Sequence, residues 1–92
     1  MGIFLKDIEL KGKTALITGA TKGIGRGTAI AIAQAGGNII AIGRNQKELE
    51  SLRKIIKKFR VKYTSFNCDV NNYESIKYFI SKLKKLDILV NN

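Results

Sequence analysis

The segment Lys13-Thr-Ala-Leu-Ile-Thr-Gly-Ala-Thr-Lys-Gly-Ile-Gly25 joins a short apolar run to a cluster of three glycines. The run from Lys13 to Thr18 has the length and composition of a buried strand. The residues after Gly25 continue with helical periodicity to about Ala35, and Gly36-Gly37 is typical of a helix C-cap. A glycine loop between a strand and a helix is the setting in which many proteins bind phosphate groups.

The three glycines have separate expected roles in such a loop. Gly19 allows the tight turn out of the strand, Gly23 lets the backbone approach a pyrophosphate, and Gly25 lets the helix pack on the sheet. The backbone N–H groups around Ile24 and Gly25, at the start of the helix, favour negative charge. Glycine also serves plain turns, but the spacing, the preceding strand and the following helix agree, so we expect a phosphate-binding loop.

The rest of the chain repeats the alternation of strands and helices. Strands are expected at 38–43, 62–67 and 87–90, and helices at about 46–59 and from Asn71 or Asn72 to about Leu83. Short connections between them predict an α/β fold with a parallel sheet and helices on both faces. Right-handed crossovers favour the N-terminal half of a doubly wound fold with strand order 3-2-1-4. Residues 1–92 are thus expected to form one partial dinucleotide-binding domain, truncated after the fourth strand.

Both later helices are expected to be amphipathic, with one apolar face toward the sheet. On the helix at 46–59 this face comprises Leu49, Leu52, Ile55, Ile56 and Phe59. On the last helix the inward residues are expected to be Ile76, Phe79, Ile80 and Leu83.

Composition and charge exclude several classes of protein. The net charge is +10, but the basic residues are mostly lysines scattered over separate segments, with no nucleic-acid-binding motif, so we interpret them as a solvated surface. No apolar run approaches the roughly 20 residues that span a bilayer, and we expect no membrane association. We assign no metal site. The single cysteine, Cys68, indicates a reducing, cytoplasmic location and is expected to be a small buried residue at a strand end.

The end of the second strand predicts which dinucleotide the loop would bind. NAD-selective folds place a carboxylate about 20 residues past the glycines, where it binds the ribose 2′-hydroxyl. Here that position is Gly43 or Arg44, and neither is acidic. Arg44 offers a planar, permanently charged donor for a 2′-phosphate, and Lys22 in the loop adds a second positive charge. Either residue alone could be a solvated surface side chain. Together they favour NADP(H).

The chain resembles the short-chain dehydrogenase/reductase family in three segments that occur in the family's order. They are Thr18-Gly-x-x-x-Gly-x-Gly25, Asn67-Cys-Asp-Val70 and Leu86-Asp-Ile-Leu-Val-Asn-Asn92. Residues 43–49 also resemble the equivalent turn of tropinone-reductase-like members, which use NADP(H). The resemblance implies a Rossmann-type fold and an oxidoreductase that transfers hydride between NADP(H) and a carbonyl or alcohol group of a small molecule.

The resemblance also implies cofactor roles for individual residues. The backbone from Thr21 to Ile24 would hold the phosphates, and Asp69 would accept a hydrogen bond from the adenine amino group. Val70 would contact the adenine ring, and Asn91 would lie near the adenosine ribose. An alternative role for Asp69 is that of a helix-capping carboxylate ahead of Asn71.

No catalytic residue can be assigned in this chain. The family's catalytic serine, its Tyr-x-x-x-Lys pair and its helix asparagine lie beyond the matched segments. Tyr73 with Lys77 and Tyr78 with Lys82 share the spacing, but both pairs precede the fourth strand. We interpret them as ordinary i,i+4 neighbours on a helix surface.

Two alternatives to a part of an oxidoreductase remain, together with one expectation about assembly. The chain could be a non-catalytic nucleotide-binding module, or a lysine-rich nucleic-acid binder. Strand order 3-2-1-4 leaves residues 87–90 at an open edge of the sheet. Because Ile88, Leu89 and Val90 carry no charge and no proline interrupts them, we expect self-association through this edge.

Overall fold

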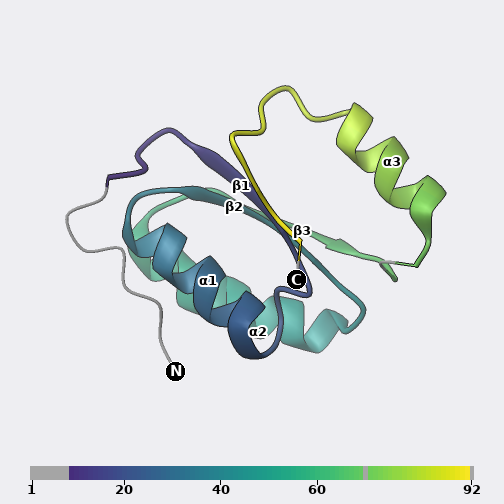
Figure 1. Cartoon of the computed structure of the whole chain (residues 1–92). Coiled ribbons are helices and arrows are strands. Elements are labelled where there is room, and N and C mark those ends of the chain that lie inside the picture. Colours follow the sequence, from purple (N-terminus) through teal and green to yellow (C-terminus); the bar gives the residue numbers. More distant parts are fainter. Residues whose placement is uncertain (1–8, 70, 92) are drawn as a thin grey trace.

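The computed structural model describes residues 9–69 and 71–91, in which a four-stranded sheet is flanked by helices (Figure 1). The elements are β1 (Thr14–Thr18), α1 (Gly23–Gln34), β2 (Asn38–Gly43), α2 (Gln46–Ile56), the 3₁₀ turn η1 (Lys57–Phe59), β3 (Tyr63–Asn67), α3 (Tyr73–Ser81) and β4 (Ile88–Val90). All paired strands are parallel, and their order is β3-β2-β1-β4. The predicted α/β class and strand order are confirmed.

The two faces of the sheet are covered unequally. Because successive strand residues point to opposite faces, Ala15 and Ile17 face α1 and α2 while Leu16 faces α3. The first face is well buried: α2 contributes three side chains with no exposed surface, namely Leu49, Leu52 and Ile56. On the second face α3 lies alone (Figure 1), and it contains no fully buried residue. It packs on the sheet through Ile76 and through Phe79, which stacks on Phe66 with the ring centroids 4.5 Å apart.

The end of α1 matches the C-cap predicted from the sequence, whereas the end of α2 differs from the prediction. At the end of α1, Gly36 has φ +96°, and its N–H donates to the Ala33 carbonyl at 3.0 Å. The N–H of Gly37 donates to the Ile32 carbonyl at 2.9 Å, which completes a Schellman C-cap. The predicted helix at 46–59, in contrast, tightens to 3₁₀ geometry after Ile56.

The expectation that Ile80 faces inward is wrong, since this side chain is 37% exposed. Ile76 and Phe79 pack toward the sheet, as expected. Successive residues of an α-helix are turned by about 100°, so Ile80 lies to one side of the line that Ile76 and Phe79 form. A helix that rests on a sheet without a neighbouring helix buries only a narrow stripe.

A partly buried hydrogen bond joins β3 to α2. The hydroxyl of Tyr63 donates to the Leu49 carbonyl at 2.8 Å. Burial, and to a lesser degree the negative charge of Glu50, raise the pKa of Tyr63 to about 12. The neutral, donating form of the phenol is therefore favoured in the folded state.

This hydrogen bond predicts a pH-dependent stability difference. Removing it in Tyr63→Phe should lower the free energy of unfolding by about 1 kcal/mol. Because the folded pKa is above the unfolded value of 10.0, the contribution is fully present below pH 10 and is lost as pH rises toward 12. Urea titrations of both proteins from pH 7 to pH 12 measure this difference in the free energy of unfolding at each pH. A difference in the free energy of unfolding that stays constant up to pH 12 would contradict the raised pKa of Tyr63 and its role as donor.

Candidate functional site

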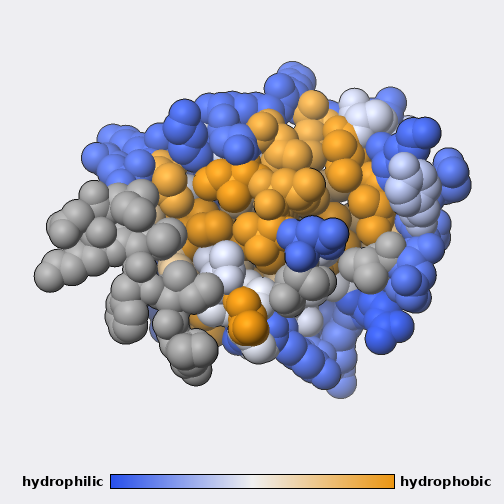
Figure 2. Space-filling view, in the orientation of Figure 1, coloured by the Kyte–Doolittle hydropathy of each residue, from blue (hydrophilic) through white to orange (hydrophobic). Residues whose placement is uncertain are grey.

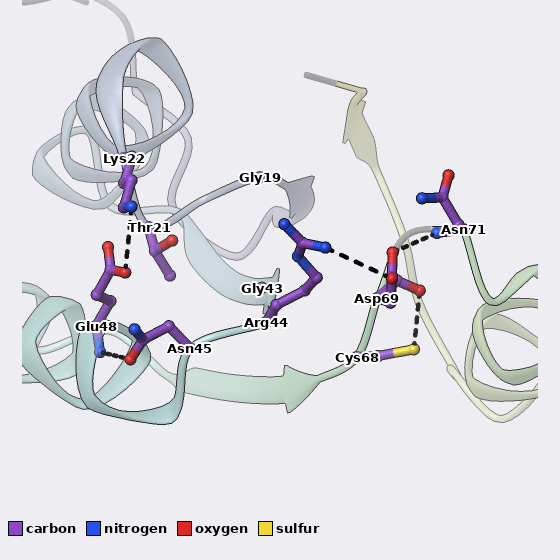
Figure 3. Close-up of a pocket in the computed structure, with 10 residues that line it drawn as sticks. All are labelled: Gly19, Thr21, Lys22, Gly43, Arg44, Asn45, Glu48, Cys68, Asp69 and Asn71. Carbon is purple, nitrogen blue, oxygen red and sulfur yellow. Dashed lines mark hydrogen bonds and ion pairs between the residues drawn. The ribbon is translucent and has the colours of Figure 1, made fainter.

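A pocket of about 580 Å³ lies at the edge where β1, β2 and β3 end (Figure 3). Its volume is in the range of small-molecule sites, and open α/β sheets bind ligands at this carboxyl edge. The residues that line it come from the loops after these strands and from the start of α2: Gly19, Thr21, Lys22, Gly43, Arg44, Asn45, Glu48, Cys68, Asp69 and Asn71.

The glycine loop adopts the tight turn that the sequence predicts. Gly19 has φ +61° and Gly23 has φ +55°, values that favour glycine. The N–H of Ala20 donates to the Ile42 carbonyl at 3.3 Å, which ties the loop to the end of β2. A Cβ on Gly23 would meet no atom within 4 Å, so in this structure its backbone conformation rather than crowding requires glycine.

The start of α1 differs from the starts of the two other helices. The Asn45 side chain caps α2 by accepting from the Glu48 N–H at 3.1 Å, and Asn72 caps α3 in the same way. Within residues 9–69 and 71–91, α1 has neither a side-chain cap at Lys22 nor an acidic residue in its first turn. The start of this helix therefore suits a bound anion.

Arg26 holds the loop in place and was not predicted from the sequence. Its guanidinium donates to the Thr21 carbonyl at 3.3 Å and to the Ser51 hydroxyl of α2 at 3.2 Å. The loop is thereby linked to α2 as well as to β2. The sequence carries no local signal for this role, because Ser51 is 25 residues away along the chain.

Two ion pairs lie across the pocket (Figure 3). Lys22 Nζ is 3.6 Å from Glu48 Oε1, and Arg44 Nη1 is 3.6 Å from Asp69 Oδ2. Asp69 also accepts from the Asn71 N–H at 2.9 Å. The alternative role of Asp69 as a helix cap is wrong, because the cap of α3 is Asn72.

The structure brings five of the predicted site residues together in the pocket: Gly19, Thr21, Lys22, Arg44 and Asp69. Gly23, Ile24 and Gly25 form the first turn of α1 and are not among the lining residues. Asn91 lies at the same edge of the sheet, where its side-chain oxygen accepts from the Thr18 hydroxyl at 3.2 Å. Val70 lies outside the described residues.

Gly43, one of the two positions considered for an NAD-selective carboxylate, is the most constrained of the lining residues whose contacts are known. A Cβ at position 43 would come within 2.9 Å of Thr21 Cγ2. Cys68, in contrast, is where the sequence predicts it: free, buried and directly after β3.

The described part of the chain shows neither a metal centre nor a membrane-spanning helix. Among residues 9–69 and 71–91, no group of His, Cys, Asp or Glu side chains is arranged to hold a metal ion. Over the same residues, none of the helices combines the length and apolar character needed to cross a bilayer.

Comparison with known proteins identifies relatives over almost the whole chain. Residues 13–92 match the family model of the short chain dehydrogenases. A 3-oxoacyl-(acyl-carrier-protein) reductase of Rickettsia conorii is 44% identical over 85 residues, which cover 92% of this chain and 34% of the relative. A 2-dehydro-3-deoxy-D-gluconate 5-dehydrogenase of Bacillus subtilis is 40% identical over 95 residues, covering 100% of this chain and 37% of the relative.

Solved structures show the same likeness. L-sorbose reductase from Gluconobacter frateurii, complexed with NADPH and L-sorbose, superposes with a TM-score of 0.81 at 33% identity, covering 94% of this chain and 35% of that chain. Carveol dehydrogenase from Mycobacterium avium, in complex with NAD, gives 0.81 at 28% identity, covering 91% and 36%. The chain spans about a third of the length of the curated relatives it matches. With the family model matched over residues 13–92, the chain belongs to the short-chain dehydrogenase family.

Proposed function

We propose that this chain binds NADP(H) in the pocket of Figure 3 and is the cofactor-binding part of an oxidoreductase. The reaction would transfer hydride between NADP(H) and a carbonyl or alcohol group of a small molecule, in the cytoplasm. The observation that carries the proposal is that Lys22 and Arg44 both line the pocket, while the end of β2 offers no carboxylate. The family relationship supports a nicotinamide cofactor, and the pocket residues support the choice between its two forms.

The phosphate-binding half of the proposal rests on the glycine loop. The pyrophosphate would lie at the start of α1, where Gly19 and Gly23 turn the backbone and the helix lacks an anionic cap within the described residues. Asp69 and Asn71 at the end of β3 would hold the adenine side of the ligand. When bound, the nicotinamide supplies the hydride, and the residues described here bind and orient the cofactor.

The preference for NADP(H) follows from charge. Related structures contain NADPH in one case and NAD in another, so family membership does not decide between them. Arg44 can donate two parallel hydrogen bonds to a phosphate, and Lys22 adds a point charge on the other side of the pocket. The 2′-hydroxyl of NAD(H) is neutral, so it can form neither an ion pair with Lys22 nor a bidentate ion pair with Arg44.

Reversing the charge at position 44 tests this preference. The wild-type chain should bind NADPH about tenfold more tightly than NADH, because a charge-assisted contact to the 2′-phosphate is absent in NADH. Arg44→Asp should abolish or reverse that ratio in calorimetric titrations. Arg60→Asp, which changes the net charge equally but lies outside the pocket, is the control. An NADPH:NADH ratio that is the same in Arg44→Asp as in wild type would remove Arg44 from the site.

The described residues do not include a candidate for the chemical step itself. Tyr73 and Tyr78 lie on α3, are 69% and 57% exposed, and are not among the residues that line the pocket. The 92-residue chain assayed with NADPH and activated ketones should therefore match a protein-free control. Turnover that disappears in Tyr73→Phe or Tyr78→Phe would instead show that one of these tyrosines is catalytic.

The proposed self-association through β4 is supported by the exposure of this strand. In the described part of the chain β4 pairs with β1 alone, and Leu89 is 59% exposed. Figure 2 shows apolar side chains gathered at the centre of the face on which β4 lies in Figure 1. We propose a second copy of the chain as the partner of this edge.

Sedimentation velocity over a concentration series tests the self-association. Because each copy carries a net charge of +10, association should strengthen with added salt. Leu89→Lys should shift the chain toward monomer. Leu86→Lys is the control, since Leu86 is also exposed but precedes the strand. A wild-type chain that stays monomeric at high concentration and high salt would rule out this interface.

A further inference from the structure

The ion pair between Lys22 and Glu48 lies on the rim of the pocket. The two side chains approach from α2 and from the loop before α1 (Figure 3), with Lys22 Nζ 3.6 Å from Glu48 Oε1. The lysine side chain is 80% exposed and the glutamate only 27%. Glu48 is therefore the more fixed partner, and its negative charge lies where the proposed 2′-phosphate contacts Lys22.

The carboxylate of Glu48 is not needed to build the start of α2. It is the backbone N–H of Glu48, rather than its side chain, that the Asn45 cap binds at 3.1 Å. Among residues 9–69 and 71–91, the carboxylate forms its one ion pair with Lys22. A negative charge in the first turn stabilises a helix only slightly. A neutral residue at position 48 would therefore leave the cap and most of the stability of α2 intact.

The charges of the four ionised side chains that line the pocket sum to zero. Lys22 is paired with Glu48, and Arg44 with Asp69. A pocket that is to receive a doubly charged phosphate thus holds two carboxylates close to the two cations. The Asp69 carboxylate also accepts a hydrogen bond from the Asn71 N–H, whereas in the described part of the chain the Glu48 carboxylate contacts Lys22 alone.

On the basis of the proposed function, we infer that Glu48 is a specificity-determining residue that weakens binding of 2′-phosphorylated nucleotides. It competes with the 2′-phosphate for Lys22 and repels it directly. The NADP(H) preference set by Lys22 and Arg44 is therefore smaller than the two cations alone would produce. Ligands that lack the 2′-phosphate do not experience this competition.

Glu48→Gln tests the inference, because it keeps the shape of the side chain and removes its charge. Affinity for NADPH and for adenosine 2′,5′-bisphosphate should rise roughly two- to fivefold, since repulsion is removed and Lys22 is released from its partner. Affinity for NADH and for 5′-AMP should stay the same. Glu50→Gln is the matched control: Glu50 lies on the same helix, is paired with Arg53 at 3.0 Å, and does not line the pocket.

A second variant connects the effect to Lys22. Lys22→Gln should weaken NADPH binding in both backgrounds, and by more in the Glu48→Gln background, where no carboxylate competes for Lys22. Calorimetry of the four proteins, with circular dichroism to confirm the fold, gives the coupling between the two positions. Equal losses of NADPH affinity from Lys22→Gln in the two backgrounds would show that Glu48 does not compete for Lys22 and would overturn the inference.

The outcomes separate this inference from the proposed function. If wild type prefers NADPH and Arg44→Asp loses that preference, but Glu48→Gln binds NADPH as wild type does, the inference about Glu48 alone is wrong. If wild type binds both cofactors equally, or neither, then the proposed preference fails and the inference fails with it. Equal tightening of NADPH and NADH in Glu48→Gln would also overturn it, because the effect would then not depend on the 2′-phosphate.

Discussion

The whole site depends on the parallel pairing of β1 with β2. In this pairing Thr18 lies beside Ile42, so the loop that leaves β1 and the turn that leaves β2 emerge at the same edge. β3 pairs with β2 in the same sense and brings Asp69 to that edge from a third segment. Antiparallel pairing of any of these strands would carry its loop to the opposite edge. Residues that are 50 positions apart in the chain thus line one pocket because the strands before them pair in parallel.

Strands and helices were predictable because their signals are local. The β-branched run at 38–43 and the glycines at 36 and 37 define β2 and the end of α1 within a residue. The site was predictable where a residue type has its own chemistry, as with Arg44 and the glycine loop. Glu48 and Arg26 were not, because their roles arise from the packing of α1 beside α2, which no local pattern encodes. Ile80 was predicted to be buried because it is apolar, but its position on α3 leaves it exposed.

The two faces of the sheet are covered unequally, so the helices on one face are packed more tightly than the helix on the other. α2 is fixed by three fully buried side chains and by the hydrogen bond from Tyr63, whereas α3 contributes no fully buried side chain and packs through Ile76 and the Phe66–Phe79 stack. Local opening should therefore begin at α3. Asp69 and Asn71 lead directly into this helix, so the adenine side of the proposed site lies on the part of the chain with the least packing.

The close approach of Gly43 to Thr21 has a consequence for how such a pocket can change over evolution. Any side chain at position 43 would have to move the methyl group of Thr21, which lies 2.9 Å from where its Cβ would be. The two positions are therefore sterically coupled, although they belong to different loops. A lineage that acquired a carboxylate at the end of β2 to accept a ribose hydroxyl would be expected to change residue 21 as well, so substitutions at these positions should be found together rather than singly.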